Sequence, residues 1–217
     1  MNKFFTHNWL IHEINRNITL SIVHYVKGFL LDIGCGETPY SDILKPQVTT
    51  HIGLDHPYTL HKNVKRDIDG DACHLPFENS SFDTVVSFQV MEHVSEPDLM
   101  IREIYRTLKK DSYVIITSPF MWGIHEEPRD FYRYTKYGLR YLFEKNGFKI
   151  IEIKANTGYW IMAGLRFNYY LSRFGGRYLK YLLSPIYYFV QVLSLVLDKI
   201  DKVESDTASY TLVARKI

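Results

Sequence analysis

The sequence of 217 residues contains only two cysteines, Cys35 and Cys73. They form no Cys-x-x-Cys pair and have no histidine close by at zinc-finger spacing, so we expect free thiols in a reducing compartment. The net charge is also small, at +2, and acidic and basic residues are interspersed. Because non-specific binding of phosphates needs a basic stripe, nucleic acid is not an expected partner.

The sequence also lacks a signal-peptide core at its beginning. In the opening stretch MNKFFTHNWLIHEINRN, the side chains of His7, Asn8, His12 and Glu13 interrupt the apolar residues. We therefore expect a cytoplasmic protein, and we leave open contact with the inner face of the membrane. The length and the 46% hydrophobic content favour a single domain over residues 1–217.

What the sequence does contain is an alternation of strand-like and helix-like segments. Apolar runs separated by turn residues predict strands at FLLDIG, THIGLD, NVKRDI, FDTVVSF, SYVIITSP, FKIIEI and, over residues 209–216, SYTLVARK. Helical patterns run over Asn8–Val26, Pro97–Leu108 and Thr135–Asn146, the last with Thr135 as its N-cap. This alternation predicts an α/β fold with a mostly parallel sheet and helices on both faces.

A glycine pair follows the first predicted strand, in LLDIGCGETPY. Glycines between a strand and a helix let the backbone approach a ligand closely. The third glycine of a dinucleotide fingerprint is replaced by Pro39, and Thr38-Pro39 is expected to be the N-cap and first residue of a helix. Asp55, at the end of the next predicted strand, can accept hydrogen bonds from both hydroxyls of a ribose. Alternatively, the glycines only make a turn and Asp55 only caps it.

The order of motifs resembles a known family. LDIGCGETPY is followed by GLD, then by GDACHLPFENSSFDTVVSFQVMEHV and EIYRTLKKDSYVIITSP. This set resembles the class I S-adenosylmethionine-dependent methyltransferases, specifically the methyltransferase type 11-like group, from about Gly28 to Lys154. It departs from the family at Thr38, where a third glycine is usual. The resemblance implies a Rossmann-like, doubly wound sheet of seven strands with an antiparallel last strand, and S-adenosylmethionine as the cofactor.

The resemblance also implies a cofactor-binding set: Asp32, Gly34, Cys35, Gly36, Asp55, Asp71, Ala72, Phe88 and Gln89. The glycine loop would approach the methionine portion, and Asp32 would orient that loop or meet the amino group. Asp55 would hold the ribose, while Asp71 and the Ala72 amide would read the edge of the adenine. For Asp71 the alternative is a turn residue after Gly70.

Candidate catalytic residues follow the fifth predicted strand, in SPFMWGIHEEPRDFYRYT. Methyl transfer from a sulfonium to a hydroxyl requires alignment and removal of a proton. We therefore predict His125 as the base and Glu126 as the carboxylate that orients it. The residues expected to contact the substrate are Trp122, Arg129 and Tyr132.

This stretch resembles the H-E-x-P-x-D-F-x-R-Y-T version found in family members associated with polysaccharide and glycolipid biosynthesis. A second interpretation is structural. Asp130, Arg133 and Tyr134 would then only brace the loop before the Thr135 helix, and His125 would be one of the groups that the brace holds.

Glu92 and His93 are a second polar pair, in SFQVMEHV. Some quinone-pathway O-methyltransferases of similar sequence bind a divalent ion here through a Glu-x-x-Glu-His set. The first glutamate of that set is Gln89 in this chain, and an amide is a poorer ligand than a carboxylate for a hard cation. We therefore expect no metal, and we interpret Glu92 and His93 as residues at a helix entry behind the cofactor.

A long aromatic segment separates the last two predicted strands. Within this insertion, residues 159–200, the stretch Tyr181–Leu197 is uncharged but slightly short for a membrane span, and Pro185 and Gln191 interrupt it. Basic residues lie among its aromatics, namely Arg166, Arg173, Arg177 and Lys180. We favour a helical hairpin that either packs on the domain or forms a homodimer interface. The alternative is that the segment makes a peripheral contact with the membrane.

The sequence therefore predicts one methyltransferase domain with an N-terminal helix in 1–27, a cofactor-binding core in 28–154, the insertion, and the last strand. The predicted activity is methyl transfer from S-adenosylmethionine to a hydroxyl of a sugar in a glycan or glycolipid precursor. A small-molecule O- or C-methyltransferase of the quinone-biosynthesis kind is the first alternative. A non-catalytic subunit that binds the cofactor is the second.

Overall fold

The computed structural model describes residues 6–59, 63–176 and 179–217. The first five residues of the expected N-terminal helix, and Arg177 of the insertion, lie outside the described residues. Contacts divide the chain into two compact units, Met1–Ile18 with Ala155–Ala208, and Thr19–Lys154 with Ser209–Ile217. The division arises because the inserted helices pack on each other and on the start of the N-terminal helix. The prediction of one methyltransferase domain over residues 1–217 stays a prediction.

The larger unit is built on a seven-stranded sheet in the order β3-β2-β1-β4-β5-β7-β6. Its strands are β1 Gly28–Ile33, β2 Val48–Asp55, β3 Ile68–Asp69, β4 Phe82–Phe88, β5 Leu108–Pro119, β6 Phe148–Ala155 and β7 Ser209–Lys216. Strands β1 to β5 pair in parallel, and β7 pairs antiparallel to β5. The expected fold class is confirmed.

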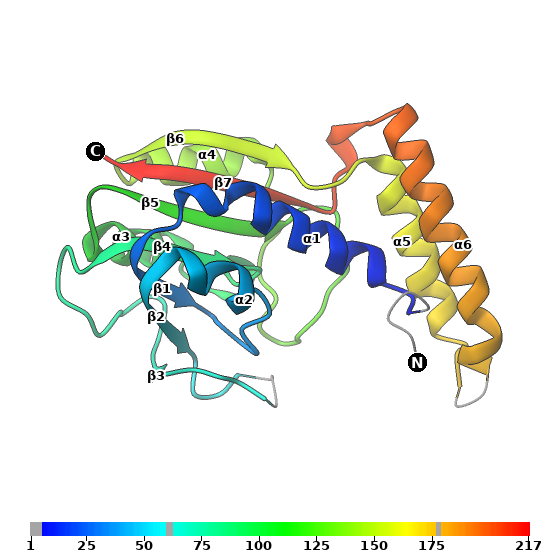
Figure 1. Cartoon of the computed structure of the whole chain (residues 1–217), viewed down its shortest axis with the longest axis horizontal. Helices are drawn as coiled ribbons and strands as arrows, with labels where there is room; N and C mark the ends of the chain where they lie inside the picture. Colours follow the sequence, from blue (N-terminus) through cyan, green and yellow to red (C-terminus); the bar gives the residue numbers. More distant parts are fainter. Residues whose placement is uncertain (1–5, 60–62, 177–178) are drawn as a thin grey trace. The chain divides into compact units, whose positions relative to one another are not determined.

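Helices cover both faces of this sheet. They are the end of α1 (Trp9–Ile22), α2 (Ser41–Leu44), α3 (Pro97–Thr107) and α4 (Lys136–Lys145). In Figure 1, α2 lies in front of the strands, whereas α3 and α4 lie behind them. Alternate strand residues point to opposite faces. Leu30 and Val86 accordingly form one buried cluster with Ile22 of α1 and Leu44 of α2.

The helix after β5 begins as the sequence predicts. The Thr135 hydroxyl accepts a hydrogen bond from the Gly138 backbone N–H at 3.1 Å, which caps α4. The helix after β1 begins later than predicted, at Ser41 with Tyr40 as its N-cap. Thr38 is in a turn instead, because its N–H donates to the Cys35 carbonyl and its φ is +51°. The prediction that Thr38-Pro39 opens the helix is therefore wrong.

One predicted strand is mostly loop. Of NVKRDI, only Ile68 joins the sheet, in the short strand β3. The residue before it bonds to β2 by its side chain as well as its backbone, because the Asp67 carboxylate accepts from the Gly53 N–H at 2.8 Å. A side chain that takes a backbone donor in this way ends regular pairing.

The smaller unit is a helical hairpin, α5 (Tyr159–Ser172) and α6 (Leu179–Ile200), with the start of α1. The two helices lie side by side (Figure 1) and approach closely at Gly164, where an added Cβ would lie 1.9 Å from the Ser194 hydroxyl oxygen. The helical insertion predicted for residues 159–200 is present. Among the described residues, one helical stretch, Tyr181–Ile200, is long and apolar enough to cross a membrane by length and composition.

Candidate active site

The carboxyl ends of β1, β2, β4 and β5 meet at one edge of the sheet, because these strands are parallel neighbours. Ligands of open α/β sheets bind at this edge. Three segments singled out from the sequence begin here: the glycine loop after Ile33, the turn after Phe88 and the loop after Pro119. The fold therefore gathers most of the predicted site at one place.

The glycine loop requires glycine at two positions. Gly34 has a φ of +68° and Gly36 a φ of +50°, a region that side-chain-bearing residues enter at a cost. At Gly34 the space is closed as well, because a Cβ would lie 2.3 Å from a methyl of Val90. The conformation of the loop itself therefore requires both glycines, and this geometry fits the turn alternative as well as the binding interpretation.

Asp55 is buried at the end of β2 and contacts this loop directly. One carboxylate oxygen accepts from the Gly36 N–H at 2.8 Å, and the other accepts from the His56 N–H at 2.7 Å. A carboxylate oxygen has a further lone pair, so both remain able to accept a ribose hydroxyl. Asp32 lies next to it, 3.1 Å from the His51 ring. Burial raises the pKa of Asp32, and the hydrogen bond from His51 opposes that rise.

Asp71 makes the turn that the alternative interpretation expected. Its carboxylate accepts from the Cys73 N–H at 2.8 Å and lies 3.5 Å from the His74 ring. A role of Asp71 and Ala72 toward adenine stays a prediction.

At the end of β4, Gln89 has a φ of +56° and donates its N–H to the Thr117 carbonyl at 3.0 Å. The Phe88 ring packs on Tyr40 at 5.1 Å. The backbone therefore turns sharply at the predicted cofactor-lining positions.

A part-buried ion pair organises the loop after β5. Arg133 donates two hydrogen bonds to Asp130, at 2.6 and 2.7 Å, and further ones to the carbonyls of Trp122 and Gly123. These hydrogen bonds hold the pKa of Asp130 well below its usual range. The bracing function considered for this loop is therefore present. Asp130 also accepts from the His125 N–H at 2.8 Å, so the same brace positions the predicted base.

The His125 ring lies in a cluster of titratable groups. Its Nδ1 is 3.2 Å from the Gly123 carbonyl oxygen and 3.4 Å from the Asp130 carboxylate. The ring packs edge-on against His93 at 4.9 Å, and the Glu126 carboxylate is 3.8 Å from His93 Nε2. Sequence reasoning missed this role of His93, although its place directly after β4 put it at the correct edge.

Glu92 is the most deeply buried member of this cluster. Its side chain is 0% exposed, and burial raises its pKa to about 8. Its backbone carbonyl accepts from the N–H groups of Phe131 and Tyr132. Glu92 and His93 belong to a single 3-10 turn, Met91–His93, that leads toward α3, as predicted for a helix entry.

The predicted substrate contacts lie along the same loop. The Arg129 guanidinium reaches the end of β2, 3.4 Å from the His56 ring. The Tyr132 hydroxyl donates to the Ser95 carbonyl at 3.0 Å. Trp122 contributes its backbone carbonyl to the Arg133 brace. Substrate binding by these three residues stays a prediction.

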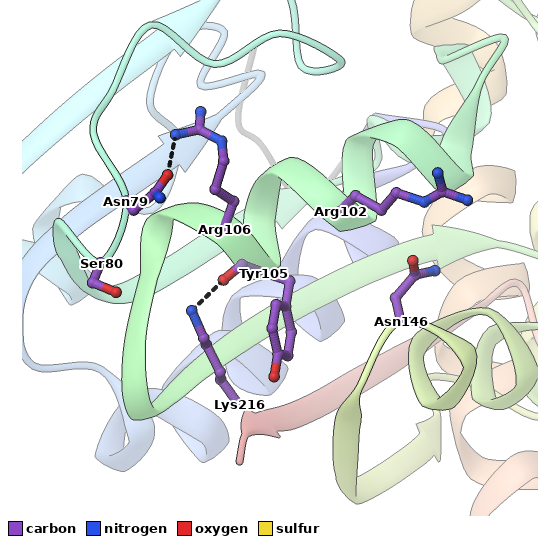
Figure 2. Close-up of a pocket in the computed structure, with 7 residues that line it drawn as sticks. All are labelled: Asn79, Ser80, Arg102, Tyr105, Arg106, Asn146 and Lys216. Carbon is purple, nitrogen blue, oxygen red and sulfur yellow. Dashed lines mark hydrogen bonds between the residues drawn. The ribbon is translucent and has the colours of Figure 1, made fainter.

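A depression of about 360 Å³ lies elsewhere on the larger unit, between α3 and the end of β7. Figure 2 shows Lys216 pointing toward Tyr105 and the end of α3. Its charged groups are already engaged, since Lys216 donates to the Tyr105 carbonyl and Arg106 donates to Glu103 and Asn79. It adjoins the amino ends of β4 and β5, opposite the edge where the glycine loop lies, so it is not the predicted cofactor site.

Comparison with known proteins agrees with this geometry. Residues 31–116 match the family model of the methyltransferase domain. A probable S-adenosylmethionine-dependent methyltransferase of Mycolicibacterium smegmatis is 30% identical over 96 residues, which cover 42% of this chain and 37% of that protein. A demethylmenaquinone methyltransferase of Lactobacillus johnsonii is 34% identical over 101 residues, covering 40% and 41%. The chain thus spans about two fifths of the length of these relatives.

Solved structures share the fold at low identity. A methyltransferase from Archaeoglobus fulgidus aligns with a TM-score of 0.60 at 18% identity, covering 94% of each chain. The [4+2]-cyclase SpnF aligns with a TM-score of 0.61 at 21% identity, covering 93% of this chain and 80% of its own. The fold is therefore that of class I methyltransferases, and residues 31–116 are similar to the methyltransferase domain family. Since the same fold also supports a cyclase, the reaction has to be argued from the site.

Proposed function

We propose that this protein transfers the methyl group of S-adenosylmethionine to a hydroxyl of a sugar, within a glycan or glycolipid precursor. The observation that carries the proposal is Asp55, a buried carboxylate that lies against the glycine loop inside a methyltransferase domain. It accepts from the loop backbone and keeps lone pairs for two ribose hydroxyls. Asp32 and the glycines would hold the methionine portion, and Asp71 with Ala72 would read the adenine.

In this proposal the residues after β5 act on the acceptor. His125 removes the hydroxyl proton as the methyl group is transferred. Glu126, whose carboxylate lies 3.8 Å from His93 Nε2, would orient His125. Asp130 holds the His125 backbone in place. Because displacement at a sulfonium needs an in-line approach, the rigid brace formed with Arg133 serves alignment as well as proton transfer.

The helical hairpin supports an amphiphilic acceptor, because the polar and apolar faces of α6 are reversed. Its buried face carries hydrogen-bonding side chains, Tyr187, Gln191, Ser194 and Asp198. Gln191 accepts from the Leu10 N–H at 3.0 Å. The exposed face is apolar, with Leu182, Ile186, Phe189, Leu193, Val196 and Ile200 each 43% exposed or more. Polar groups inside and apolar groups outside are typical of helices that pack in lipid.

The charge of the hairpin points in the same direction. Residues 155–197 contain no aspartate or glutamate, but they include Arg166, Arg173, Arg177 and Lys180. A basic segment with an apolar face complements an anionic bilayer surface. We therefore propose that the hairpin attaches the protein to the membrane in which a lipid-linked acceptor resides. A hairpin that packs on the domain or forms a homodimer, which the sequence favoured, is the competing outcome.

A small-molecule methyltransferase of the quinone-biosynthesis kind is the second candidate. It is favoured by the similarity to the Lactobacillus johnsonii demethylmenaquinone methyltransferase. A quinol acceptor is also hydrophobic, so membrane attachment alone does not separate the two candidates. The chemistry of the acceptor does.

The test is an acceptor screen with methyl-labelled S-adenosylmethionine. Long-chain alkyl glycosides, the free sugars of the same glycosides, and a demethylated quinol are each incubated with the full chain. The proposal expects label in the alkyl glycosides and much less in the free sugars. Label in the quinol alone would favour the second candidate, and tight cofactor binding with no transfer to any acceptor would favour the non-catalytic subunit.

A further inference from the structure

Three side chains with metal-binding atoms converge beside the proposed acceptor position. Glu92, His93 and His125 each place one ligand atom within 4.8 Å of the others. Glu92 and His93 come from the turn after β4, and His125 comes from the loop after β5, so the fold brings together residues that the sequence keeps apart. The Glu126 carboxylate lies at the rim, 3.8 Å from His93 Nε2.

Both histidine rings are oriented for coordination. His93 Nδ1 is 2.7 Å from the Arg129 carbonyl, and His125 Nδ1 is 3.2 Å from the Gly123 carbonyl. A carbonyl oxygen can only accept, so Nδ1 of His93 is placed to carry the proton and its Nε2 to present a lone pair. His125 Nδ1 faces two acceptors, the Gly123 carbonyl and Asp130, at shorter distances than the donor Arg133 Nη2 at 3.5 Å, which favours the same tautomer. A backbone carbonyl that fixes the tautomer from behind is the usual support for a metal-binding histidine.

The environment of Glu92 supports a metal site independently of the two histidines. Its side chain is 0% exposed, and within the part of the chain that the structure describes neither carboxylate oxygen has a hydrogen-bond partner. Buried carboxylates are normally paired or bound to a metal, because an unpaired one is costly. The unpartnered oxygens lie beside His93, with Oε1 at 3.8 Å from its Nε2.

We propose that Glu92, His93 and His125 bind a divalent transition-metal ion of the zinc type. Two imidazole nitrogens and one carboxylate oxygen form a donor set that suits zinc with one open position, and it suits magnesium or calcium poorly. Ligand atoms at about 2.1 Å from zinc lie about 3.4 Å apart in a tetrahedron, so small side-chain rotations close the site. The partly exposed side of His125 leaves room for a fourth ligand.

This site differs from the sequence expectation of no metal, and also from the Glu-x-x-Glu-His set. Gln89 still removes the first glutamate of that set, and the third ligand comes instead from His125, far along the chain. If the proposed function holds, a hydroxyl bound at the open position would lose its proton more readily. His125 Nε2 would then be a metal ligand in the loaded protein and a free base in the metal-free protein.

Zinc binding to the full chain, after chelator treatment and dialysis, tests the site without any acceptor. Calorimetry with zinc chloride should show one tight site per chain. Glu92→Gln and His125→Gln should each weaken it about tenfold or more. Cobalt chloride should give the strong visible absorption of a four- or five-coordinate ion in the wild-type protein and lose it in the variants.

The controls are His24→Gln and Glu144→Gln, which change the same residue types at exposed positions away from the site. They should bind zinc as the wild type does. Circular dichroism checks folding, and if Glu92→Gln does not fold, the more exposed His125→Gln decides. Equal zinc affinity in the wild type and His125→Gln would overturn the proposal. Such a result would exclude the zinc site without excluding methyl transfer by the metal-free protein. The zinc site and the proposed function are therefore tested separately.

Discussion

The Asp55 carboxylate accepts a hydrogen bond from the backbone N–H of Gly36 at 2.8 Å, across the gap between the ends of β2 and β1. This contact fixes the loop whose glycines would run beneath the cofactor. The same carboxylate is the proposed acceptor for the ribose hydroxyls. Binding of the cofactor and the shape of its loop are therefore coupled through one buried side chain.

Gly34→Ala should damage the cofactor loop. The residue has a φ of +68°, and the added methyl would lie 2.3 Å from Val90, so both strain and overlap oppose the substitution. We expect a loss of about 2 kcal/mol or more in the free energy of unfolding, measured by urea titration. Gly138→Ala is the control, because its Cβ would meet its nearest atom at an ordinary 3.5 Å. Equal stability of the two variants would contradict the described loop.

Asp130→Asn should destabilise the protein near neutral pH and progressively less as the pH falls below about 4. The hydrogen bonds from Arg133 hold the pKa of Asp130 below its unfolded value. A carboxylate with a depressed pKa stabilises the fold above the unfolded pKa, about 3.9, and this contribution is lost as the pH falls through the folded value. Breaking this part-buried pair should cost about 2 kcal/mol at pH 7. Urea titrations at pH 7 and pH 3 that gave the same difference from wild type would contradict the role of the charge.

His125→Ala should lower methyl transfer about a hundredfold or more, while affinity for S-adenosylmethionine stays nearly unchanged. The reason is that His125 acts on the acceptor, in the loop after β5, whereas the predicted cofactor residues lie at or after the ends of β1, β2, β3 and β4. Turnover on an accepted glycoside, cofactor affinity and thermal unfolding are measured together. A fall in stability that matches the fall in turnover would assign His125 to the brace alone.

Replacing Leu182, Phe189 and Val196 by serine should abolish binding to liposomes that contain anionic lipid. These side chains lie on the exposed apolar face of α6, whose burial in the bilayer drives attachment. Wild-type binding should weaken as salt is added, because the segment is basic. Tyr137→Ser with Tyr141→Ser, two exposed aromatics of α4, is the control. A protein that ignores lipid but gains mass with concentration would show that the face forms a homodimer instead.

The sequence predicts the sheet well because its strands are short apolar runs with clear turn residues between them. The last strand, Ser209–Lys216, and the Thr135 cap are found as expected. The helix start after β1 was missed, because a turn with a positive φ at Thr38 gives no signal when the residue is neither glycine nor asparagine.

The sequence predicts those parts of the site that lie within one local motif. It does not predict contacts between segments that are distant in the sequence. The glycine loop and Asp55 follow from local motifs. The approach of His93 to His125 depends on how two loops pack, and no spacing in the sequence encodes that distance. The reversed faces of α6 were hidden for a similar reason, because an aromatic and apolar segment does not reveal which side its few polar residues face until its neighbours are known.

Calorimetric titration of S-adenosylmethionine into the full chain tests the central claim most directly. The account predicts saturable binding at one site, weakened by about 2 kcal/mol or more in Asp55→Ala, because two hydrogen bonds from ribose hydroxyls to a carboxylate are lost. Asp111→Ala, at an exposed position within β5, should bind as the wild type does. Circular dichroism confirms that both variants are folded. Absence of binding by the wild type, or equal affinity in wild type and folded Asp55→Ala, would contradict the account.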